Sequence, residues 1–142
     1  MIMFKEFESE DWSKIKDPVE PFAPDKSSLS KFLSTIKNGI SMTATEDGEI
    51  MACGGIVLEG DDNGTVWCRV SKKCSSHSLS WSRTIREAFG LMMDTVGDLN
   101  ISTYILSGFC KGDKLARLIG LKKTNETESN NGNTYYRYRT VI

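Results

Sequence analysis

The chain has 142 residues, a length typical of one domain, so we expect a single domain over residues 1–142. Hydrophobic residues make up 39% of the chain and charged residues 26%, which indicates an ordered globular protein and excludes a disordered one. The formal net charge of −1 excludes the strong positive field that drives binding to nucleic acid or to an anionic membrane surface, so we expect neither partner.

Targeting signals and cysteine spacing bear on the compartment. No apolar run approaches the roughly 20 residues that a membrane-spanning helix needs, and the N-terminus lacks the apolar region of a signal peptide. The four cysteines, Cys53, Cys68, Cys74 and Cys110, form no C-x-x-C pair. A zinc site built from Cys68, Cys74 and His77 fits no known ligand spacing. We therefore predict a cytoplasmic protein without a metal site.

The N-terminal residues predict a short strand, a short helix and a loop. The strand is expected over Met3–Phe7, where apolar and polar residues partly alternate. Ser9 is placed to cap a helix that contains Trp12. Residues 17–24 hold three prolines, which remove backbone donors and favour an irregular loop. This loop is either a connector or one wall of a substrate pocket, with Glu20 as its polar group.

A second helix should follow the loop. Apolar residues recur at the i, i+3, i+4 and i+7 spacing of an amphipathic helix: Leu29, Phe32, Leu33 and Ile36. Ser27 or Ser28 is the expected N-cap, because a serine hydroxyl can accept a hydrogen bond from a free N–H of the first turn. Gly39 is the expected stop at the C-terminal end.

Three strands with short connections predict an antiparallel meander. They are expected at Ile40–Thr45, Glu49–Leu58 and Thr65–Ser71. The Asp47–Gly48 pair between the first two is a strong hairpin signal. Gly54–Gly55 within the second strand predicts either a bulge or the close approach of another backbone or a ligand.

The C-terminal half predicts a helix, a strand, a second helix and a final hairpin. Apolar residues recur at helical spacing over Trp81–Thr95. The next strand, Leu99–Ser107, is expected to lie parallel to Thr65–Ser71, because a helix separates the two in the chain. A helix is expected over Lys111–Ile119, and the final strands are expected at Leu121–Glu128 and Thr134–Val141.

The connection Lys72–Ser80 is basic and rich in serine, and it leads from a strand into the N-terminus of a helix. Unpaired backbone N–H groups and the positive end of the helix dipole meet at such a point, which favours a bound anion. Lys72, Lys73, His77 and Arg83 would add positive charge or hydrogen-bond donors around it. The alternative is that these are ordinary solvated loop residues.

The predicted order β-α-α-β-β-β-α-β-α-β-β resembles the GCN5-related N-acetyltransferase (GNAT) fold over essentially the whole chain. Gly120–Leu121 is similar to the Gly-Phe pair that closes the last helix of that family. Val66–Trp67, His77, Trp81 and Arg83 resemble short phage proteins with this fold, such as the internal virion protein A group of T7-like phages. The resemblance implies an α/β (α+β) protein with a mixed, mostly antiparallel sheet of about seven strands, flanked by about four helices.

The resemblance also implies a cofactor and a reaction. In that family acetyl-CoA lies between the fourth and fifth strands, and an amine attacks its thioester directly. The pantetheine would follow Cys68–Val70, and a backbone N–H near Val70 would stabilise the oxyanion. The pyrophosphate would lie over Ser75–Arg83. The implied cofactor-binding residues are Cys68, Val70, Ser76, His77, Ser80 and Arg83.

The chain departs from the family pattern at two places. Cys74–Arg83 has no glycine, although the family signature uses glycines to let phosphate approach the backbone. Ala116 stands where a tyrosine often protonates the leaving thiolate. Tyr104 is a candidate substitute for that tyrosine. The candidates for the general base are Glu20, Glu59 and His77.

Two hypotheses follow. The first is an acetyl-CoA-dependent N-acetyltransferase of phage type, which modifies an amine or a protein acceptor. The second is a catalytically inactive protein of the same fold, which serves virion assembly or binds a host protein. Either would act in the host cytoplasm or in the virion.

Overall fold

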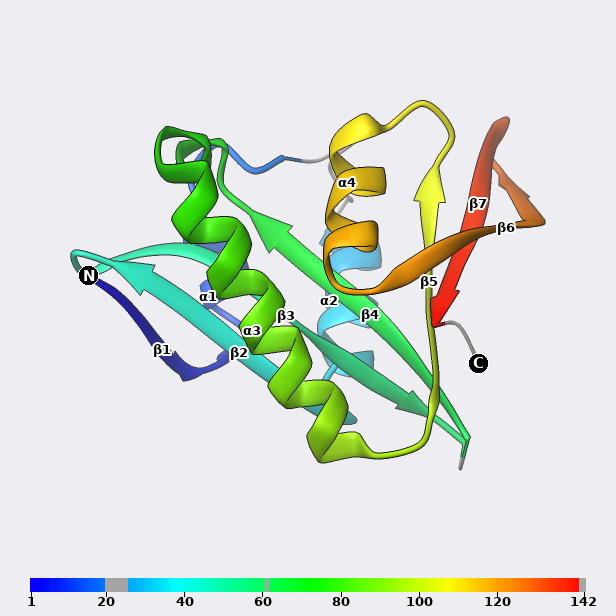
Figure 1. The fold of residues 1–142 in the computed structure, drawn as a ribbon, viewed down its shortest axis with the longest axis horizontal. Coiled ribbons are helices and arrows are strands. Elements are labelled where there is room, and N and C mark those ends of the chain that lie inside the picture. Colours follow the sequence, from blue (N-terminus) through cyan, green and yellow to red (C-terminus); the bar gives the residue numbers. More distant parts are fainter. Residues whose placement is uncertain (20–25, 61, 141–142) are drawn as a thin grey trace.

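A computed structural model describes residues 1–19, 26–60 and 62–140 of the chain, which form one mixed sheet with helices on both faces (Figure 1). The strands are β1 (Ile2–Glu6), β2 (Gly39–Glu46), β3 (Glu49–Glu59), β4 (Asn63–Val70), β5 (Asn100–Leu106), β6 (Leu121–Asn130) and β7 (Asn133–Thr140). The helices are α1 (Asp11–Lys14), α2 (Lys26–Thr35), α3 (Ser78–Val96) and α4 (Cys110–Leu118), with a 3₁₀ turn, η1 (Lys72–His77), before α3. The predicted order of elements and the predicted fold class are confirmed.

The seven strands lie in the order β1-β2-β3-β4-β5-β7-β6. Every neighbouring pair is antiparallel except β4 and β5, which are parallel, as predicted. These two strands pair only at their beginnings, where Asn63–Thr65 lie beside Asn100–Ser102. Beyond that point they diverge, so the middle of the sheet opens into a V.

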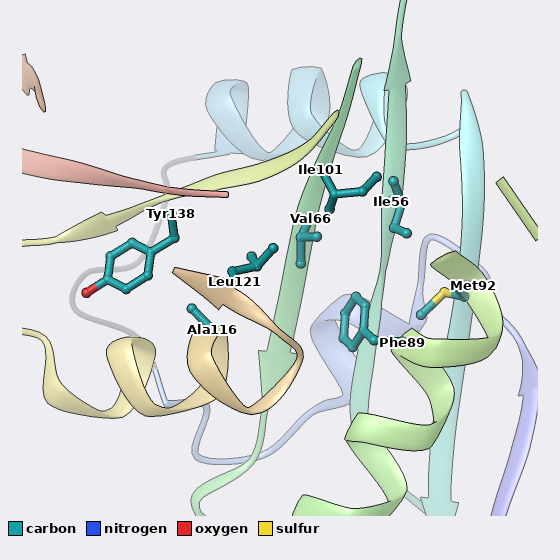
Figure 2. Packing of buried hydrophobic residues seen from close by; sticks show 8 residues of the cluster. All are labelled: Ile56, Val66, Phe89, Met92, Ile101, Ala116, Leu121 and Tyr138. Carbon is teal, nitrogen blue, oxygen red and sulfur yellow. The ribbon is translucent and has the colours of Figure 1, made fainter. Parts of the chain in front are cut away.

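The two faces of the sheet are covered by different helices. Helices α3 and α4 lie on one face, and α1 and α2 lie behind the sheet in Figure 1. Successive residues of a strand point to opposite faces, so Val66 joins the core under α3 and α4 while Trp67 joins the core under α1 and α2. Figure 2 shows the first core, which consists of Ile56, Val66, Phe89, Met92, Ile101, Ala116, Leu121 and Tyr138.

Helix α3 presents the predicted apolar stripe to the sheet. Trp81, Ala88, Phe89 and Met92 are buried, whereas Arg83 on the opposite side is exposed. The helix begins at Ser78, earlier than the sequence predicts, and η1 takes up most of the predicted polar connection. Ser71 starts this turn, because its hydroxyl accepts a hydrogen bond from the Lys73 N–H at 3.1 Å.

Two predicted caps are wrong. Ser9 does not cap α1, because the helix starts at Asp11 and the Asp11 carboxylate accepts the Glu8 N–H instead. Helix α2 already includes Lys26, so Ser27 and Ser28 lie inside the helix and not at the predicted N-cap position. In both cases the N-cap preference of serine alone does not determine where the helix starts.

The glycines of β2 and β3 serve close strand contacts. Gly39 does not stop α2 but opens β2, where a Cβ would lie 2.0 Å from the Ile56 carbonyl oxygen. A Cβ at Gly55 would lie 2.3 Å from the Ile40 carbonyl oxygen. Of the two alternatives for Gly54–Gly55, close backbone approach is therefore the one found, since the register shift of β2 against β3 lies between Ala44 and Thr45.

Asp11 anchors α1 to the sheet. Its carboxylate is fully buried and accepts hydrogen bonds from the Glu8 N–H at 2.9 Å, the Thr43 hydroxyl at 2.8 Å and the Lys5 ammonium at 3.1 Å. Burial by itself would raise the pKa of Asp11, but these hydrogen bonds outweigh it and lower the pKa below its usual value.

We expect Asp11→Ala to destabilise the fold by about 3 kcal/mol, because it removes charge-assisted hydrogen bonds and leaves buried donors unpaired. Because the folded pKa of Asp11 is lowered, this contribution is present above the unfolded pKa of about 4 and is lost as the pH falls through the folded pKa. Urea unfolding at several pH values checks both points. Asp94→Ala, which removes an exposed carboxylate of α3, is the control. A stability difference that persists unchanged well below the unfolded pKa would contradict this role for Asp11.

Candidate functional site

A cavity of about 400 Å³ lies where β4 and β5 diverge. The Thr103 hydroxyl donates to the Val66 carbonyl at 3.0 Å, next to the last backbone pairing of the two strands. The lining comes from both faces of the sheet, since it includes Phe89 of α3 as well as Trp12 of α1 and Trp67 of β4. The cavity therefore connects the two faces through the opening in the sheet.

The edge of β4 turns backbone donors toward this opening. Ser71 N–H donates to Met51 of β3 at 2.9 Å, whereas the Val70 carbonyl accepts Val19 N–H at 2.7 Å on the opposite side. Because backbone groups alternate sides along a strand, the N–H groups of Cys68 and Val70 point away from β3. Both residues line the cavity. This edge can therefore hold a ligand group that carries hydrogen-bond acceptors.

A second cavity, of about 190 Å³, lies beside the N-terminal turn of α3. Its lining includes polar side chains of η1 and α3: Lys72, Ser75, Ser78 and Ser82. Four residues line both cavities, so the two adjoin: Val19, Val70, Lys111 and Leu115. The larger compartment thus continues into a smaller one that is also mostly apolar and that adds serine hydroxyl groups and the Lys72 side chain to the lining.

The charged side chains in the described lining of the two cavities are lysines. Lys111 is the charged residue in the described lining of the larger cavity, and Lys72 joins it at the smaller one. No aspartate or glutamate lies among the described lining residues of either. A ligand with anionic groups at the α3 end and an apolar body toward the strands matches this distribution.

The predicted cofactor-binding residues fall into two groups. Cys68 and Val70 line the larger cavity. The others, Ser76, His77, Ser80 and Arg83, are exposed and line neither cavity. The His77 Nδ1 atom lies 3.3 Å from the Ser76 hydroxyl and 3.8 Å from a Glu46 carboxylate oxygen. A cofactor role for these four residues stays a prediction.

The predicted catalytic residues are placed as follows. Tyr104 of β5 lines the larger cavity and is 44% exposed. Ala116 of α4 lines it too, so α4 contributes no hydroxyl at that position. Glu59 accepts a hydrogen bond from the Thr65 hydroxyl at 3.0 Å and does not line the cavity. Glu20 lies outside the described residues.

Cys68 is the sulfur-bearing residue in the described lining of the larger cavity. Burial raises the pKa of its thiol to about 12, and nearby Cys74 adds to the effect. Burial likewise raises the pKa of Cys74 to about 12. Both side chains are therefore protonated near neutral pH, and neither supplies the thiolate that covalent catalysis requires.

The described residues hold neither a cluster of metal ligands nor a helix that could span a membrane. Over residues 1–19, 26–60 and 62–140, no three histidine, cysteine, aspartate or glutamate side chains come together to hold a metal ion. No helix in this part of the chain combines the length and the apolar character needed to cross a bilayer.

The sequence did not reveal every residue of the site. Lys111 and Leu115 join the two cavities, and Trp12, Phe32 and Trp67 form an aromatic wall at the far end of the larger one. These residues come from four separate elements, and only the tertiary fold brings them together. The apolar spacing of the helix that holds Phe32 indicated core packing and nothing more.

Comparison with known proteins identifies the fold. The sequence matches no protein-family model and no curated protein. Among solved structures, an acetyltransferase from Streptococcus agalactiae matches with a TM-score of 0.74 and 12% identity, over 99% of this chain and 98% of that chain. The GNAT-family acetyltransferase from Streptococcus pneumoniae matches with a TM-score of 0.70 and 14% identity, over 100% and 99% of the two chains.

An IAA acetyltransferase from Bacillus cereus also matches, with a TM-score of 0.71 and 10% identity over 100% of both chains. At such low identity these similarities establish the arrangement of elements and not the activity. The chain therefore has the GNAT fold, with a seven-stranded mixed sheet and four helices in its described residues.

Proposed function

We propose that this chain is an acetyl-CoA-dependent N-acetyltransferase that transfers an acetyl group directly to an amine. The observation that carries the proposal is the pair of adjoining cavities at the divergence of β4 and β5. The apolar lining of both cavities suits the pantetheine and acetyl groups, and the Lys72, Lys111 and serine side chains in the lining of the smaller cavity would supply positive charge and hydroxyl groups for the phosphates. The bound cofactor would supply an activated acetyl group.

The chain's own residues would bind and orient the reactants. The N–H groups of Cys68 and Val70 would hold acceptor atoms along β4, and the apolar lining would exclude water. Tyr104 would hold a proton at its hydroxyl, and Glu20 is the proposed base. Because the Cys68 thiol stays protonated, direct transfer is favoured over a route through an acylated cysteine.

Positive charge would compensate for the absence of glycines from the predicted phosphate loop. Without glycine in Cys74–Arg83, the backbone cannot approach phosphate as closely as the family signature allows. Lys111 of α4 and Lys72, at the start of η1, both line the smaller cavity. A phosphate group between them would be held by charge from two sides.

We expect Lys111→Ala to weaken acetyl-CoA binding five- to tenfold, or about 1 kcal/mol, because it removes one solvent-accessible charge from the phosphate region. Isothermal titration measures the change. Lys114→Ala is the matched control, since Lys114 lies on the same helix, is exposed and lines neither cavity. Equal affinities for the two variants would remove Lys111 from the proposed site. Arg83→Ala is titrated in the same way. Only a fall in its affinity for acetyl-CoA would support a place for Arg83 in the proposed site.

The alternative is a catalytically inactive protein of this fold that assists phage virion assembly or binds a host protein. Two observations favour it: Cys74–Arg83 holds no glycine, and Ala116 stands at the cavity in place of the family's tyrosine. The proposed phage origin and a setting in host cytoplasm or virion rest on the resemblance of residues such as Val66–Trp67 and Trp81. Absence of any acetyl-CoA binding would favour this alternative.

A further inference from the structure

Strand β6 forms one edge of the sheet. It pairs with β7 on one side and, among the described residues, with no strand on the other. In Figure 1 the hairpin of β6 and β7 lies at the end of the sheet away from β1 and β2. The strand has ten residues, and all of them except Leu121 and Thr124 are exposed. The free edge of such a strand carries backbone donors and acceptors that can pair with another strand.

The charges of β6 are divided between its two halves. The lysines come first and the glutamates follow: Lys122, Lys123, Glu126 and Glu128. Opposite charges that face each other across an antiparallel pair of strands stabilise it. Strand β6 is therefore complementary to an antiparallel copy of itself, because the basic half of each copy then lies against the acidic half of the other.

Two of these charges remain for a partner. Lys123 lies over a tyrosine ring of β7, 4.1 Å from its centre. Glu126 accepts a hydrogen bond from an arginine of β7 at 2.8 Å. In contrast, neither Lys122 nor Glu128 forms an ion pair within the described part of the chain.

Lys122 and Glu128 point to the same face of the sheet. Lys122 lies opposite Arg139 of β7, and Glu128 lies opposite Tyr135 of the same strand. Opposite residues of an antiparallel pair share a face, and so do residues of one strand that are four positions apart. Lys122 of one copy can therefore meet Glu128 of a second copy directly across an antiparallel pair.

The shape of β6 fits this register. Its pairing with β7 is regular over residues 121–123 and 127–130 and shifts between these two segments. The Thr124 hydroxyl fixes the shape of the shift, because it accepts a hydrogen bond from the Glu126 N–H at 3.1 Å. When two copies pair in the stated register, each regular segment lies against the other regular segment, and the irregular residues of both copies meet at the two-fold axis.

We propose that the chain forms a two-fold dimer through β6, in which the strands of two copies pair antiparallel and Lys122 of each copy forms an ion pair with Glu128 of the partner subunit. The two seven-stranded sheets then become one continuous sheet. The interface is the same patch on both copies, so the ion pair occurs twice. No residue of β6 belongs to the described lining of either cavity at β4, so the dimer stands or falls independently of the proposed function.

Charge reversal tests the register. Sedimentation equilibrium of the wild-type protein should show a dimer whose dissociation constant rises with salt concentration, because the ion pairs are exposed. Lys122→Glu and Glu128→Lys each place like charges opposite one another at two points. Each should therefore raise the dissociation constant of its own dimer about 30-fold. An equimolar mixture of the two variants should dimerise as the wild type does, because every like-charge pair becomes an opposite-charge pair in the mixed dimer.

Glu87→Lys is the control, since it changes the net charge as Glu128→Lys does, at an exposed position of α3. It should dimerise with wild-type affinity, and circular dichroism should show that all three variants are folded. A wild-type protein that stays monomeric at millimolar concentration would overturn the proposal. Reversals that leave the dimer intact would also overturn it, because the interface would then lie on another surface, such as the β1 edge. A mixture that stays as monomeric as its two components would overturn the contact between Lys122 and Glu128.

Discussion

Leu115→Trp should weaken acetyl-CoA binding about 100-fold or more, which corresponds to about 3 kcal/mol. Leu115 lines both cavities at the point where they adjoin. A tryptophan there adds a large ring to the space that a ligand would need in order to reach from the phosphate region to the strands. Titration with acetyl-CoA measures the loss of affinity.

The same substitution at the next position of α4 provides the control. Lys114 is exposed and lines neither cavity, so Lys114→Trp should bind acetyl-CoA as the wild type does. Thermal unfolding should show that both variants are folded, because Leu115 is only half-buried and α4 accepts a bulky side chain on its outer surface. Full affinity in folded Leu115→Trp would show that the ligand does not pass between the two cavities.

Phe89→Asp should unfold the protein. Phe89 is 3% exposed and packs in the core under α3, where Figure 2 shows its ring beside Met92. Removing a buried phenylalanine costs about 3–5 kcal/mol, and burying an unpaired carboxylate adds to that cost. The sum approaches or exceeds the total stability of many single domains, which is about 5–15 kcal/mol.

Circular dichroism in the far and near ultraviolet should report the loss of structure in Phe89→Asp. Leu91→Asp is the matched control on the same helix, because Leu91 is 62% exposed and a carboxylate there stays in water. We expect its stability to differ from wild type by no more than about 0.5 kcal/mol. A folded Phe89→Asp protein would mean that α3 packs through a different face.

The fold was largely predictable because strong local patterns agreed with the final packing. The apolar stripe of α3 is long and regular, and a helix between β4 and β5 required them to be parallel. Element ends were less predictable. The start of α3 depends on η1 and its cap at Ser71, and the role of Gly39 depends on its contact with Ile56 in another strand.

The sequence predicted residues of the site only where they lie on one continuous segment of the chain. Cys68 and Val70 follow from the strand that borders the opening, and both line the cavity. Lys111 and Trp12 could not be found in this way, because they reach the cavity from helices that are distant in sequence. The same limit applies to the serines of η1 and α3. Which of them line the smaller cavity depends on how η1 and α3 are rotated about their axes, and composition does not predict that rotation.

Titration of the wild-type protein with acetyl-CoA, and separately with CoA, tests the proposed cofactor site most directly. We expect both to bind with micromolar affinity, because CoA carries the phosphates and pantetheine that the two adjoining cavities suit. The absence of heat and of saturation up to millimolar concentrations of either ligand would contradict the proposal, and the inactive scaffold would then be the function to pursue.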